Sequence, residues 1–393
     1  ITLPLTFLQT RYLTPASQQP PFLQAQHEGG ASVFQDIVIR CVRYAFANLD
    51  PRIGRVFFGK PVALPWLRWR MLRHGLVKAP VHWREYKDKN ITGIWAITDP
   101  SKRPDIVLYY AHGGGFSMGS AYFYLEFLIS WLHLLHHEAG YSNPAVFALD
   151  YTLVPEACFP TQLHQMVAGY EHALAMAGDS ARVCVAGDSA GGTLVLSLLL
   201  HLAHPKLVVL VDNDDNDNNN KSNNKADKGG KGGKKVHLLP GTTRHLRKPD
   251  MSVLISPWPA LHSPLYKNTS SDYLDADALQ LYASQYAGTP AHVHDHLASP
   301  GDCKDVAWWR DACLSTGGIF IAYGQEEVFA PEIEKLVQLL HKAGADVSVR
   351  KQDAGIHAWP VVSLFLGDSA EQRLKGLRSM VKEMRSRIAP AKG

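Results

Sequence analysis

The sequence predicts an α/β protein with a mostly parallel central sheet flanked by helices. From about residue 81 onward, short apolar runs alternate with stretches of helical periodicity, which is the pattern of parallel β-α-β units. Several runs, such as PAVFALDY at 144–151, are apolar nearly throughout, as buried strands are. The chain has 393 residues, 46% of them hydrophobic and 19% charged. This composition is ordinary for a folded globular protein, and the length allows a large core.

The expected strands and helices follow one another along the chain. The first two strands form a pair, with Asn90 near their turn. The strands are expected over 81–88, 91–98, 105–115, 144–151, 182–189, 251–258, 318–324 and 346–352. Helical periodicity predicts helices over 122–140, 161–178, the stretch after Ser189, 331–344 and 368–387, with short helices in the Tyr/His/Asp-rich region before about 312.

The first 80 residues are predicted to form an N-terminal arm and a helical cap. Residues 1–30 are rich in Pro, Gln and Thr, which predicts an extended arm. Apolar positions recur at three and four residues over 32–49, which predicts an amphipathic helix. The Trp- and Arg-rich segment 65–76 is also expected to be helical. Such a block packs against the core, covers a site as a lid, or lies on a membrane surface.

The start of the chain, ITLPLTFL, is apolar but much shorter than the ~20 residues that cross a bilayer. Because the chain begins with Ile rather than Met, we expect a processed product or a fragment. Two interpretations stay open for these residues: the remnant of a membrane anchor, or a frayed apolar terminus.

A low-complexity tract interrupts the alternation of strands and helices. Residues 212–248 cannot bury enough apolar area to offset chain entropy, so they are predicted to be a disordered surface insertion. Residues 212–249 carry nine Lys/Arg and five Asp/Glu. Their net charge of +4 equals the net charge of the whole chain. With the basic excess in such a tract, nucleic acid binding is not expected. The predicted division is 1–80 arm and cap, 81–211 first part of the core, 212–248 insertion, and 249–393 second part of the core with cap elements at about 263–312.

The sequence predicts neither a metal site nor a disulfide framework. The five cysteines are too few and too scattered for either. The alternating histidines His292, His294 and His296 have ligand-like spacing but no nearby partners. We therefore expect no metal ion and no organic cofactor.

The most informative segment is Gly187-Asp188-Ser189-Ala190-Gly191, which fits Gly-x-Ser-x-Gly between a predicted strand and a predicted helix. The turn in such a motif is so tight that the serine is strained and the residues two positions away must lack side chains. The helix that follows directs its free N–H groups at the place where negative charge develops. The alternative, a dinucleotide-binding turn, needs a Gly-x-Gly-x-x-Gly spacing that is absent. Ser189 is predicted to be a nucleophile.

A serine nucleophile needs a base and a carboxylate that orients the base. Among the 19 histidines, His357 in GIHAWP follows the last predicted strand, late in the chain after Ser189. The strand at 318–324 ends before Glu326 and Glu327, at the carboxyl edge of the sheet. Glu327 is predicted to be the acid because it directly precedes an apolar pair, and Glu326 is the alternative.

Three consecutive glycines at the end of the run over 105–115 complete the constellation. They let the backbone approach a substrate closely, so that N–H groups can be aimed at a carbonyl oxygen that becomes an oxyanion. Gly114 and Gly115 are predicted to supply two donors, and Ala190, the residue after the nucleophile, the third. A plain glycine turn would explain one of these motifs but not both, in this order, with a downstream acid and histidine.

These motifs resemble the blocks of the hormone-sensitive-lipase-like esterases, in order from about residue 105 to 365. The resemblance implies an α/β-hydrolase fold with an N-terminal helical cap and a triad of Ser189, His357 and Glu327. Most members carry Asp at the acid position, which leaves Glu326 open. The matching blocks are HGGGF at 112–116, DYTLVPEACFP at 150–160, GDSAGG at 187–192, ISPW at 255–258, the acid after YG, and GIH at 355–357.

The same resemblance implies supporting roles for two further parts of the chain. A structural loop is expected to support the oxyanion turn, and it contains Asp150, Tyr151, Pro155 and Glu156. Asp188 is expected to support the nucleophile without itself being catalytic. The N-terminal block and the Asn/Lys-rich insertion are similar to those of fungal steryl acetyl hydrolases, which are anchored in the endoplasmic reticulum. This implies an endomembrane location if an anchor precedes this chain, and a cytoplasmic one otherwise.

Together the motifs predict a serine carboxylesterase that hydrolyses small-molecule esters of short acyl chains, steryl acetates among the candidates, through an acyl-enzyme. An amidase or formamidase with the same triad is the first alternative. A non-catalytic small-molecule receptor or lipid-surface binding protein on the same fold is the second. The presence of His357 argues against a receptor, whereas the Trp/Arg segment keeps membrane association open. The oligomeric state is left open.

Overall fold

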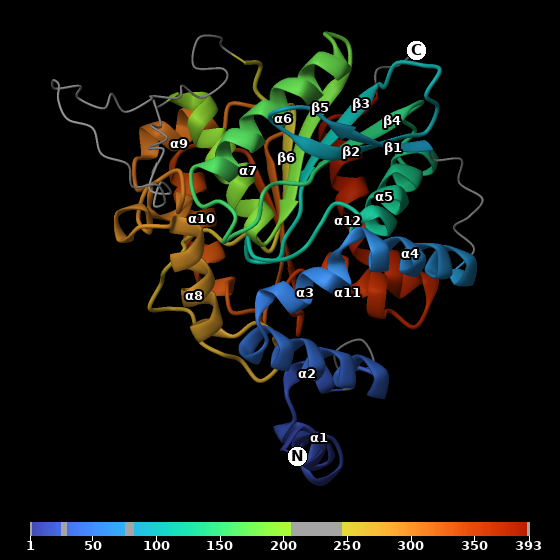
Figure 1. Ribbon diagram of the computed structural model, residues 1–393, viewed down its shortest axis with the longest axis vertical. Helices are drawn as coiled ribbons and strands as arrows, with labels where there is room; N and C mark the ends of the chain where they lie inside the picture. The colour runs from blue at the N-terminus through green and yellow to red at the C-terminus, as the bar shows by residue number, and fades with distance from the viewer. Residues whose placement is uncertain (1, 25–29, 75–81, 206–245, 391–393) are drawn as a thin grey trace, which may run out of the picture.

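An eight-stranded sheet forms the centre of the computed structural model, which describes residues 2–24, 30–74, 82–205 and 246–390 (Figure 1). The strands lie in the order β1-β2-β4-β3-β5-β6-β7-β8. All of the predicted strands are present. Their bounds are β1 His82–Lys87, β2 Thr92–Ile97, β3 Ile106–Ala111, β4 Pro144–Leu149, β5 Arg182–Asp188, β6 Met251–Ile255, β7 Ile319–Gly324 and β8 Val347–Gln352.

The sheet is mostly parallel, as the alternation of strands and helices predicts. β1 pairs with β2 and β2 with β4 in antiparallel fashion, whereas the pairings that join β4, β3, β5, β6, β7 and β8 are parallel. Ala111 of β3 lies opposite Gly187 of β5, and Asp188 of β5 lies opposite Ile255 of β6. This register brings the carboxyl ends of three neighbouring strands together.

Helices cover both faces of the sheet, and the strands divide their side chains between two cores. Val107 and Tyr109 of β3 belong to the core shared with α6, α7 and α10, whereas Leu108 and Tyr110 belong to the core shared with α5 and α12. Side chains alternate along a strand. A strand covered on both faces must therefore be apolar at every position, which explains the unbroken apolar runs.

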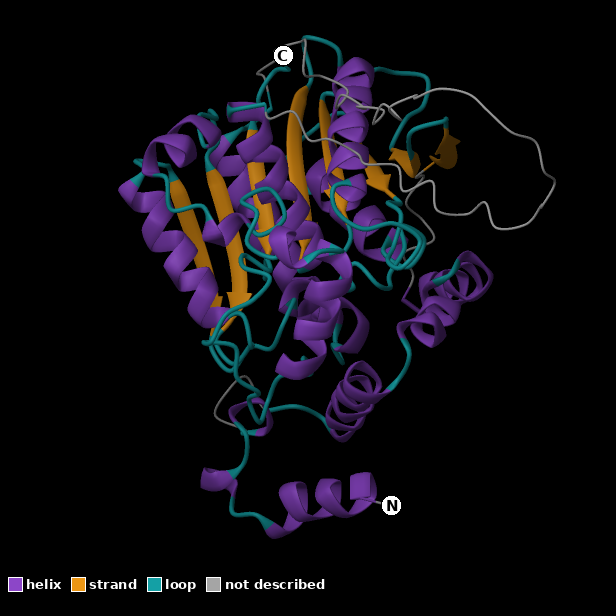
Figure 2. Ribbon diagram, turned by 60° about the vertical axis from the view of Figure 1, so that its left-hand side comes forward, coloured by secondary structure: helices purple, strands orange, loops and turns teal. Residues whose placement is uncertain are grey.

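The helices predicted from the periodicity are present, and the N-terminal residues form a further layer of helices. Helices α1 to α4 lie at the end of the molecule toward which the parallel strands point, with α1 farthest from the sheet and α4 beside α5 (Figures 1 and 2). The bounds are α1 Thr2–Leu8, α2 Val33–Asn48, α3 Pro51–Phe58, α4 Lys60–His74, α5 Leu125–His137, α6 Thr161–Ala177, α7 Ala190–Ala203, α8 Ala276–Ala287, α9 Val306–Ala312, α10 Ala330–Lys342, α11 Trp359–Leu366 and α12 Ala370–Arg387.

The prediction of an extended arm over residues 1–30 is wrong for its first part. Residues Thr2–Leu8 form α1, and Gln9–Leu13 continue it as a wider helical turn. The prediction rested on a composition rich in Pro, Gln and Thr, which does not exclude a helix around Pro4. Proline is tolerated in the first turn of a helix, because the N–H groups there have no intrahelical acceptor. Residues 14–24 are irregular with short 3-10 turns, closer to the expectation.

The predicted disordered insertion, 212–248, lies outside the described residues except for its last three. Those three are attached to the core. Arg247 donates a hydrogen bond to the carbonyl of Ala181 at 3.0 Å, and its own carbonyl accepts one from Tyr170 at 2.7 Å. The predicted end of the insertion is therefore too late, because these contacts hold the backbone just before β6. The other domain boundaries stay predictions.

None of the helices within the described ranges combines the length and the apolarity that spanning a membrane requires.

Candidate active site

Ser189 lies at the turn between β5 and α7, where the Gly-x-Ser-x-Gly pattern predicts it. Its φ of 50° and ψ of −119° are strained for a residue with a side chain. Hydrogen bonds on both sides hold this backbone. The Ser189 N–H donates to the carbonyl of Ile255 at 3.0 Å, and the Trp258 N–H donates to the carbonyl of Ser189 at 3.1 Å. The turn thus presents the hydroxyl at the carboxyl edge of the sheet.

The glycines on either side of Ser189 are required by close backbone contacts. A Cβ at Gly187 would lie 2.6 Å from the carbonyl of Gly191, and one at Gly191 would lie 2.0 Å from the carbonyl oxygen of Ala111. Both distances are far inside van der Waals contact. The helix therefore begins directly against the end of β3, and this approach brings its N-terminus beside the glycine turn that follows β3.

The glycine turn after β3 adopts conformations that side chains disfavour. Gly114 has a φ of 115° and Gly115 a φ of 60°. Both residues line one cavity together with Ser189. Among the hydrogen bonds between described residues, none uses the N–H of Gly114, Gly115 or Ala190 as a donor. These are the three N–H groups that the sequence predicts as oxyanion donors.

Asp188 ties the glycine turn to the serine turn from behind. Its buried carboxylate accepts hydrogen bonds from the hydroxyls of Tyr110 at 2.7 Å and Tyr124 at 2.6 Å, and from the N–H of Gly113 at 2.8 Å. A charged side chain out of water needs such donors. With them, Asp188 holds the two backbone segments in register, in agreement with the supporting position that the family resemblance implies.

The loop over 150–156 supports the same turn from its other side. Tyr151 stacks on His112 at a ring-centroid distance of 4.3 Å and donates its hydroxyl to the His112 carbonyl at 2.8 Å. The carboxylate of Asp150 accepts a hydrogen bond from the N–H of Ala121 at 3.0 Å. Glu156 pairs with Arg55 of α3 at 2.6 Å. The loop therefore connects the glycine turn with the N-terminal helices.

His357 follows β8 and lies beside Glu327, which follows β7. The His357 Nδ1 atom is 3.9 Å from Glu327 Oε1, and both side chains are buried. This distance is that of an ion pair and exceeds a hydrogen bond. Within the described part of the chain, neither atom has a hydrogen-bond partner. Such contacts in unliganded sites often shorten only when substrate binds.

Glu326, the alternative acid, is held in a different way. Its backbone N–H donates to the carbonyl of Gly355 at 2.8 Å, and its own carbonyl accepts from the Thr269 hydroxyl at 2.7 Å. Its side chain is half-buried. The fold thus places the carboxylate of Glu327 beside His357 and uses the backbone of Glu326 to join neighbouring loops.

Ser256 is a supporting residue that the sequence pattern did not single out. Its hydroxyl donates to Glu327 Oε2 at 2.5 Å and accepts from the N–H of Ala358 at 2.9 Å. The N–H of Gly324 also donates to Glu327 Oε2, at 2.9 Å. Ser256 therefore links the glutamate to the residue directly after His357. The ISPW block contains Ser256, but nothing in its sequence indicates this contact.

Asp272 is the second residue that sequence reasoning missed. One carboxylate oxygen accepts the backbone N–H of His357 at 3.0 Å, and the other accepts the N–H of Val328 at 2.9 Å. Its carbonyl accepts a hydrogen bond from Arg43 of α2. Asp272 thus joins the histidine loop, the glutamate loop and the N-terminal layer. It lies far from all three in the sequence, so no local pattern reveals it.

The electrostatics of the site favour a protonated histidine. Burial alone lowers the pKa of His357, but the neighbouring carboxylates, Glu327 first among them, together outweigh burial and leave the pKa raised. Asp272 and Asp188 act in the same direction. Burial in turn raises the pKa of each of these two aspartates. A histidine that takes up a proton here is therefore stabilised by the surrounding carboxylates.

The cavity in front of Ser189 has a volume of about 240 Å³ and is mostly apolar. Ser189 and His357 line it with the glycine turn, and the N-terminal helix α2 closes part of it. Besides α2, its walls come from α3, α8, α11 and the segments before α5 and α8. The apolar wall residues include Ile39, Val42, Phe46, Phe58, Phe123, Leu279, Val361 and Phe365. Apolar walls with a few convergent polar groups are typical of small-molecule sites.

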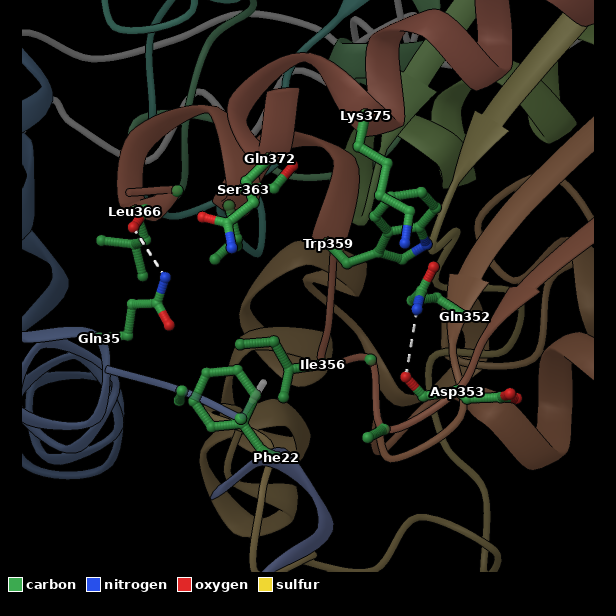
Figure 3. Close-up of a pocket in the computed structure, with 16 residues that line it drawn as sticks. Phe22, Gln35, Gln352, Asp353, Ile356, Trp359, Ser363, Leu366, Gln372 and Lys375 are labelled. Carbon is green, nitrogen blue, oxygen red and sulfur yellow. Dashed lines mark hydrogen bonds between the residues drawn. The ribbon is translucent and has the colours of Figure 1, made fainter. Parts of the chain in front are cut away.

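The N-terminal layer also packs on the outer side of the histidine loop. A second hollow of about 160 Å³ lies there. Phe22, Gln35, Ile356 and Trp359 are among the residues that line it (Figure 3). The Gln35 side chain donates to the carbonyl of Leu366 at 2.9 Å. The loop that carries His357 is therefore enclosed between the sheet and the N-terminal segments.

The alternating histidines do not converge. His292 contacts the carbonyl of Ala287, His294 contacts Asp302, and His296 packs edge-on against Trp308. In the ranges that the structure describes, no three His, Cys, Asp or Glu side chains come together as a metal site would require.

Comparison with known sequences identifies relatives. A protein-family model described as the alpha/beta hydrolase fold matches residues 108–361. An acetyl-hydrolase of Streptomyces hygroscopicus is 28% identical over 268 residues, which is 66% of this chain and 70% of that protein. Human hormone-sensitive lipase is 30% identical over 114 residues, 28% of this chain but only 10% of the lipase. The chain thus spans only a small part of the lipase.

Comparison with solved structures agrees on the fold. An esterase of the bacterial hormone-sensitive lipase family superposes with a TM-score of 0.62 at 21% identity and covers 91% of this chain and 99% of its own. Carboxyl esterase 2 of the mycorrhizal fungus Tuber melanosporum gives a TM-score of 0.58 at 18% identity, over 79% and 87% of the two chains. The chain therefore belongs to the α/β-hydrolase fold family, with hormone-sensitive lipases and a bacterial acetyl-hydrolase among its relatives.

Proposed function

We propose that the protein is a serine carboxylesterase that cleaves esters of short acyl chains. The observation that carries this proposal is that the strained Ser189, His357 and the glycine turn line one mostly apolar cavity, with Glu327 buried beside His357. Among the hydrogen bonds between described residues, the N–H groups of Gly114, Gly115 and Ala190 donate none. The similarity of the chain to an acetyl-hydrolase and to hormone-sensitive lipase supports ester hydrolysis.

In the first half of the proposed reaction, the Ser189 hydroxyl attacks the ester carbonyl and His357 takes the hydroxyl proton. The carbonyl oxygen becomes negative and accepts hydrogen bonds from the N–H groups of Gly114, Gly115 and Ala190. Glu327 stabilises the protonated imidazole. His357 then donates its proton to the leaving alcohol, and the acyl group stays on Ser189.

In the second half, water takes the place of the alcohol. His357 accepts a proton from the water, whose oxygen attacks the acyl carbonyl and forms a second tetrahedral intermediate at the same N–H groups. His357 returns the proton to the Ser189 oxygen as the acyl bond breaks. A carboxylic acid leaves, and the enzyme is restored without any cofactor.

The size and walls of the cavity support a short acyl chain. A volume of about 240 Å³ lies at the small end of ligand sites. Acetate esters of bulky apolar alcohols, steryl acetates among them, are our specific candidates. The acetyl-hydrolase relative supports the acetyl side, and the largely apolar cavity wall supports an apolar alcohol.

The experiment that tests this proposal measures hydrolysis of p-nitrophenyl esters of increasing chain length, and of a steryl acetate, by the protein and its Ser189→Ala variant. We expect the highest kcat/KM for the shortest acyl chains and a loss of at least about 10³-fold in the variant. Equal rates in the two proteins would overturn the proposal. Faster cleavage of p-nitroanilides or formamides than of esters would assign the site to amides instead.

A further inference from the structure

The exposed apolar side chains of this protein gather on its N-terminal layer. Of the 21 large hydrophobic side chains that are exposed among the described residues, 16 lie between residues 5 and 72. Val56 is 63% exposed and Leu72 is 74% exposed. Single exposed apolar residues are normal, but a concentration on one layer marks a contact surface. The most exposed members on α3 and α4 are Ile53, Val56, Phe57, Trp66, Trp69 and Leu72.

The same layer carries an excess of positive charge. Residues 1–74 contain nine Lys/Arg and three Asp/Glu, a net charge of +6, whereas the remainder contains 31 and 33, a net charge of −2. Arg68 and Arg73 are exposed on α4, among its tryptophans. The guanidinium of Arg73 lies over the Trp69 ring at 5.2 Å, and Trp66 stacks on Trp69 at 4.9 Å. Aromatic and basic side chains on one amphipathic face are what a lipid headgroup region accepts.

A groove leads from this surface to the candidate active site. It has a volume of about 750 Å³ and lies between α2, α3, α4 and α11, with Phe57, Trp66 and Arg73 among its walls. Four of its residues, Val38, Phe123, Phe365 and Leu366, also line the cavity in front of Ser189. The two hollows therefore adjoin along a shared apolar wall.

We propose that helices α3 and α4 dock on the surface of an anionic phospholipid bilayer, and that an apolar ester passes from the bilayer through the groove into the cavity. The apolar side chains enter the headgroup region, and the cations pair with lipid phosphates. Lys and Arg side chains near an anionic membrane are attracted to its surface and strengthen binding. The positive charge favours this occupant over a second copy of the chain, whose equally basic face would repel it. The docking itself does not need catalysis, whereas the passage of an ester rests on the proposed function.

The test uses the full chain with Ser189→Ala, so that vesicles are not consumed, and measures co-sedimentation with phosphatidylcholine vesicles with and without phosphatidylglycerol. We expect binding that requires phosphatidylglycerol and weakens with added salt. The Val56→Ser/Leu72→Ser pair, neither of which lines the groove or the cavity, should weaken binding by about tenfold or more. The matched pair Met176→Ser/Leu314→Ser, also exposed but on α6 and after α9, should bind unchanged.

Two outcomes would overturn the docking. The first is an absence of vesicle binding, or equal loss in both pairs of variants. The second is a dimer, by light scattering, that Val56→Ser/Leu72→Ser converts to monomer, which would make a second copy the occupant. Hydrolysis of a water-soluble p-nitrophenyl acetate by the variants with Ser189 restored separates the two proposals. Failure of that reaction with vesicle binding intact would defeat the proposed function alone.

Discussion

At the residue scale, the site depends on carboxylates that burial alone would disfavour. Glu327, Asp272 and Asp188 surround His357, and each is held by hydrogen bonds from hydroxyl or backbone groups. Taking such donor groups out of water costs little free energy when an ionised carboxylate accepts their hydrogen bonds in place of water. The result is a histidine whose protonated form is stabilised, and this can be measured through the pH dependence of the rate.

The first prediction concerns the acid. His357 must be neutral to act as a base, and its pKa is raised above the ordinary 6.5 by Glu327. The rate should therefore fall as the pH drops through this raised value. In Glu327→Gln the largest of the effects that raise the His357 pKa is lost while burial still lowers it, so the acidic limb should move to lower pH. The rate at neutral pH should also fall by about 10³- to 10⁴-fold.

Glu326→Gln is the matched control for this prediction, because it changes the adjacent carboxylate in the same way. We expect less than about a threefold loss and an unchanged acidic limb. A full pH-rate profile of both variants decides between the two residues. A loss of activity in Glu326→Gln, together with near-normal activity in Glu327→Gln, would make Glu326 the acid instead.

The second prediction concerns Asp272 as a positioning residue. Asn keeps one acceptor oxygen but presents an NH₂ group to the other backbone N–H, so the histidine and glutamate loops lose one tie. In the unmodified protein, the negative charge of Asp272 also raises the pKa of His357. Asp272→Asn should lower kcat by about 10- to 100-fold with little change in KM, and should move the acidic limb to lower pH. A purely structural role would lower thermal stability without moving that limb.

At the scale of elements, the strand-to-helix turn between β5 and α7 is the most constrained part of the fold. The start of α7 approaches the end of β3 so closely that position 191 has no room for a side chain. This approach aligns the N–H of Ala190 with the glycine turn. The geometry of the site is therefore set by packing between two elements.

The third prediction follows from that contact. In Gly191→Ala the new methyl group would meet the Ala111 carbonyl, so the helix must move away from the strand. Overpacking of this kind costs about 1–3 kcal/mol or more, and the rate should fall in the fraction that stays folded. Gly54→Ala on α3 is the control, because its new methyl comes nearest to the flexible Met118 side chain, at 3.3 Å, and otherwise makes only ordinary contact with the Phe58 ring, at 3.8 Å. Thermal unfolding of both variants tests this, and equal melting temperatures would contradict it.

At the scale of the whole molecule, the sheet, the cavity and the basic N-terminal layer follow one another along the direction of the parallel strands. The parallel strands point toward the N-terminal layer, and the cavity lies between the two. Arginines of the layer reach across to backbone carbonyls of the core, such as Arg43 to Asp272 and Arg55 to Ser117. The layer is therefore part of the site rather than a separate cover. Its outer face, basic and apolar, is left for the proposed lipid surface.

Much of this arrangement could be predicted from the sequence. The unbroken apolar runs reflect strands buried on both faces, and each predicted strand is present. The serine and glycine turns were recognisable because their backbone geometry demands particular residues at fixed spacing. The helix at Thr2–Leu8 was missed, because its proline lies in the first turn, where it costs no hydrogen bond.

The sequence by itself determined the order of elements and the position of Ser189, because both depend on local periodicity and local backbone strain. Only the tertiary structure decided which of two adjacent glutamates faces His357. It also revealed Ser256 and Asp272, and it showed that the exposed apolar and basic residues share one surface. These contacts join residues from 30 to more than 200 positions apart. Such pairs are brought together by the register of the sheet and by helix packing, and short sequence patterns carry no record of them.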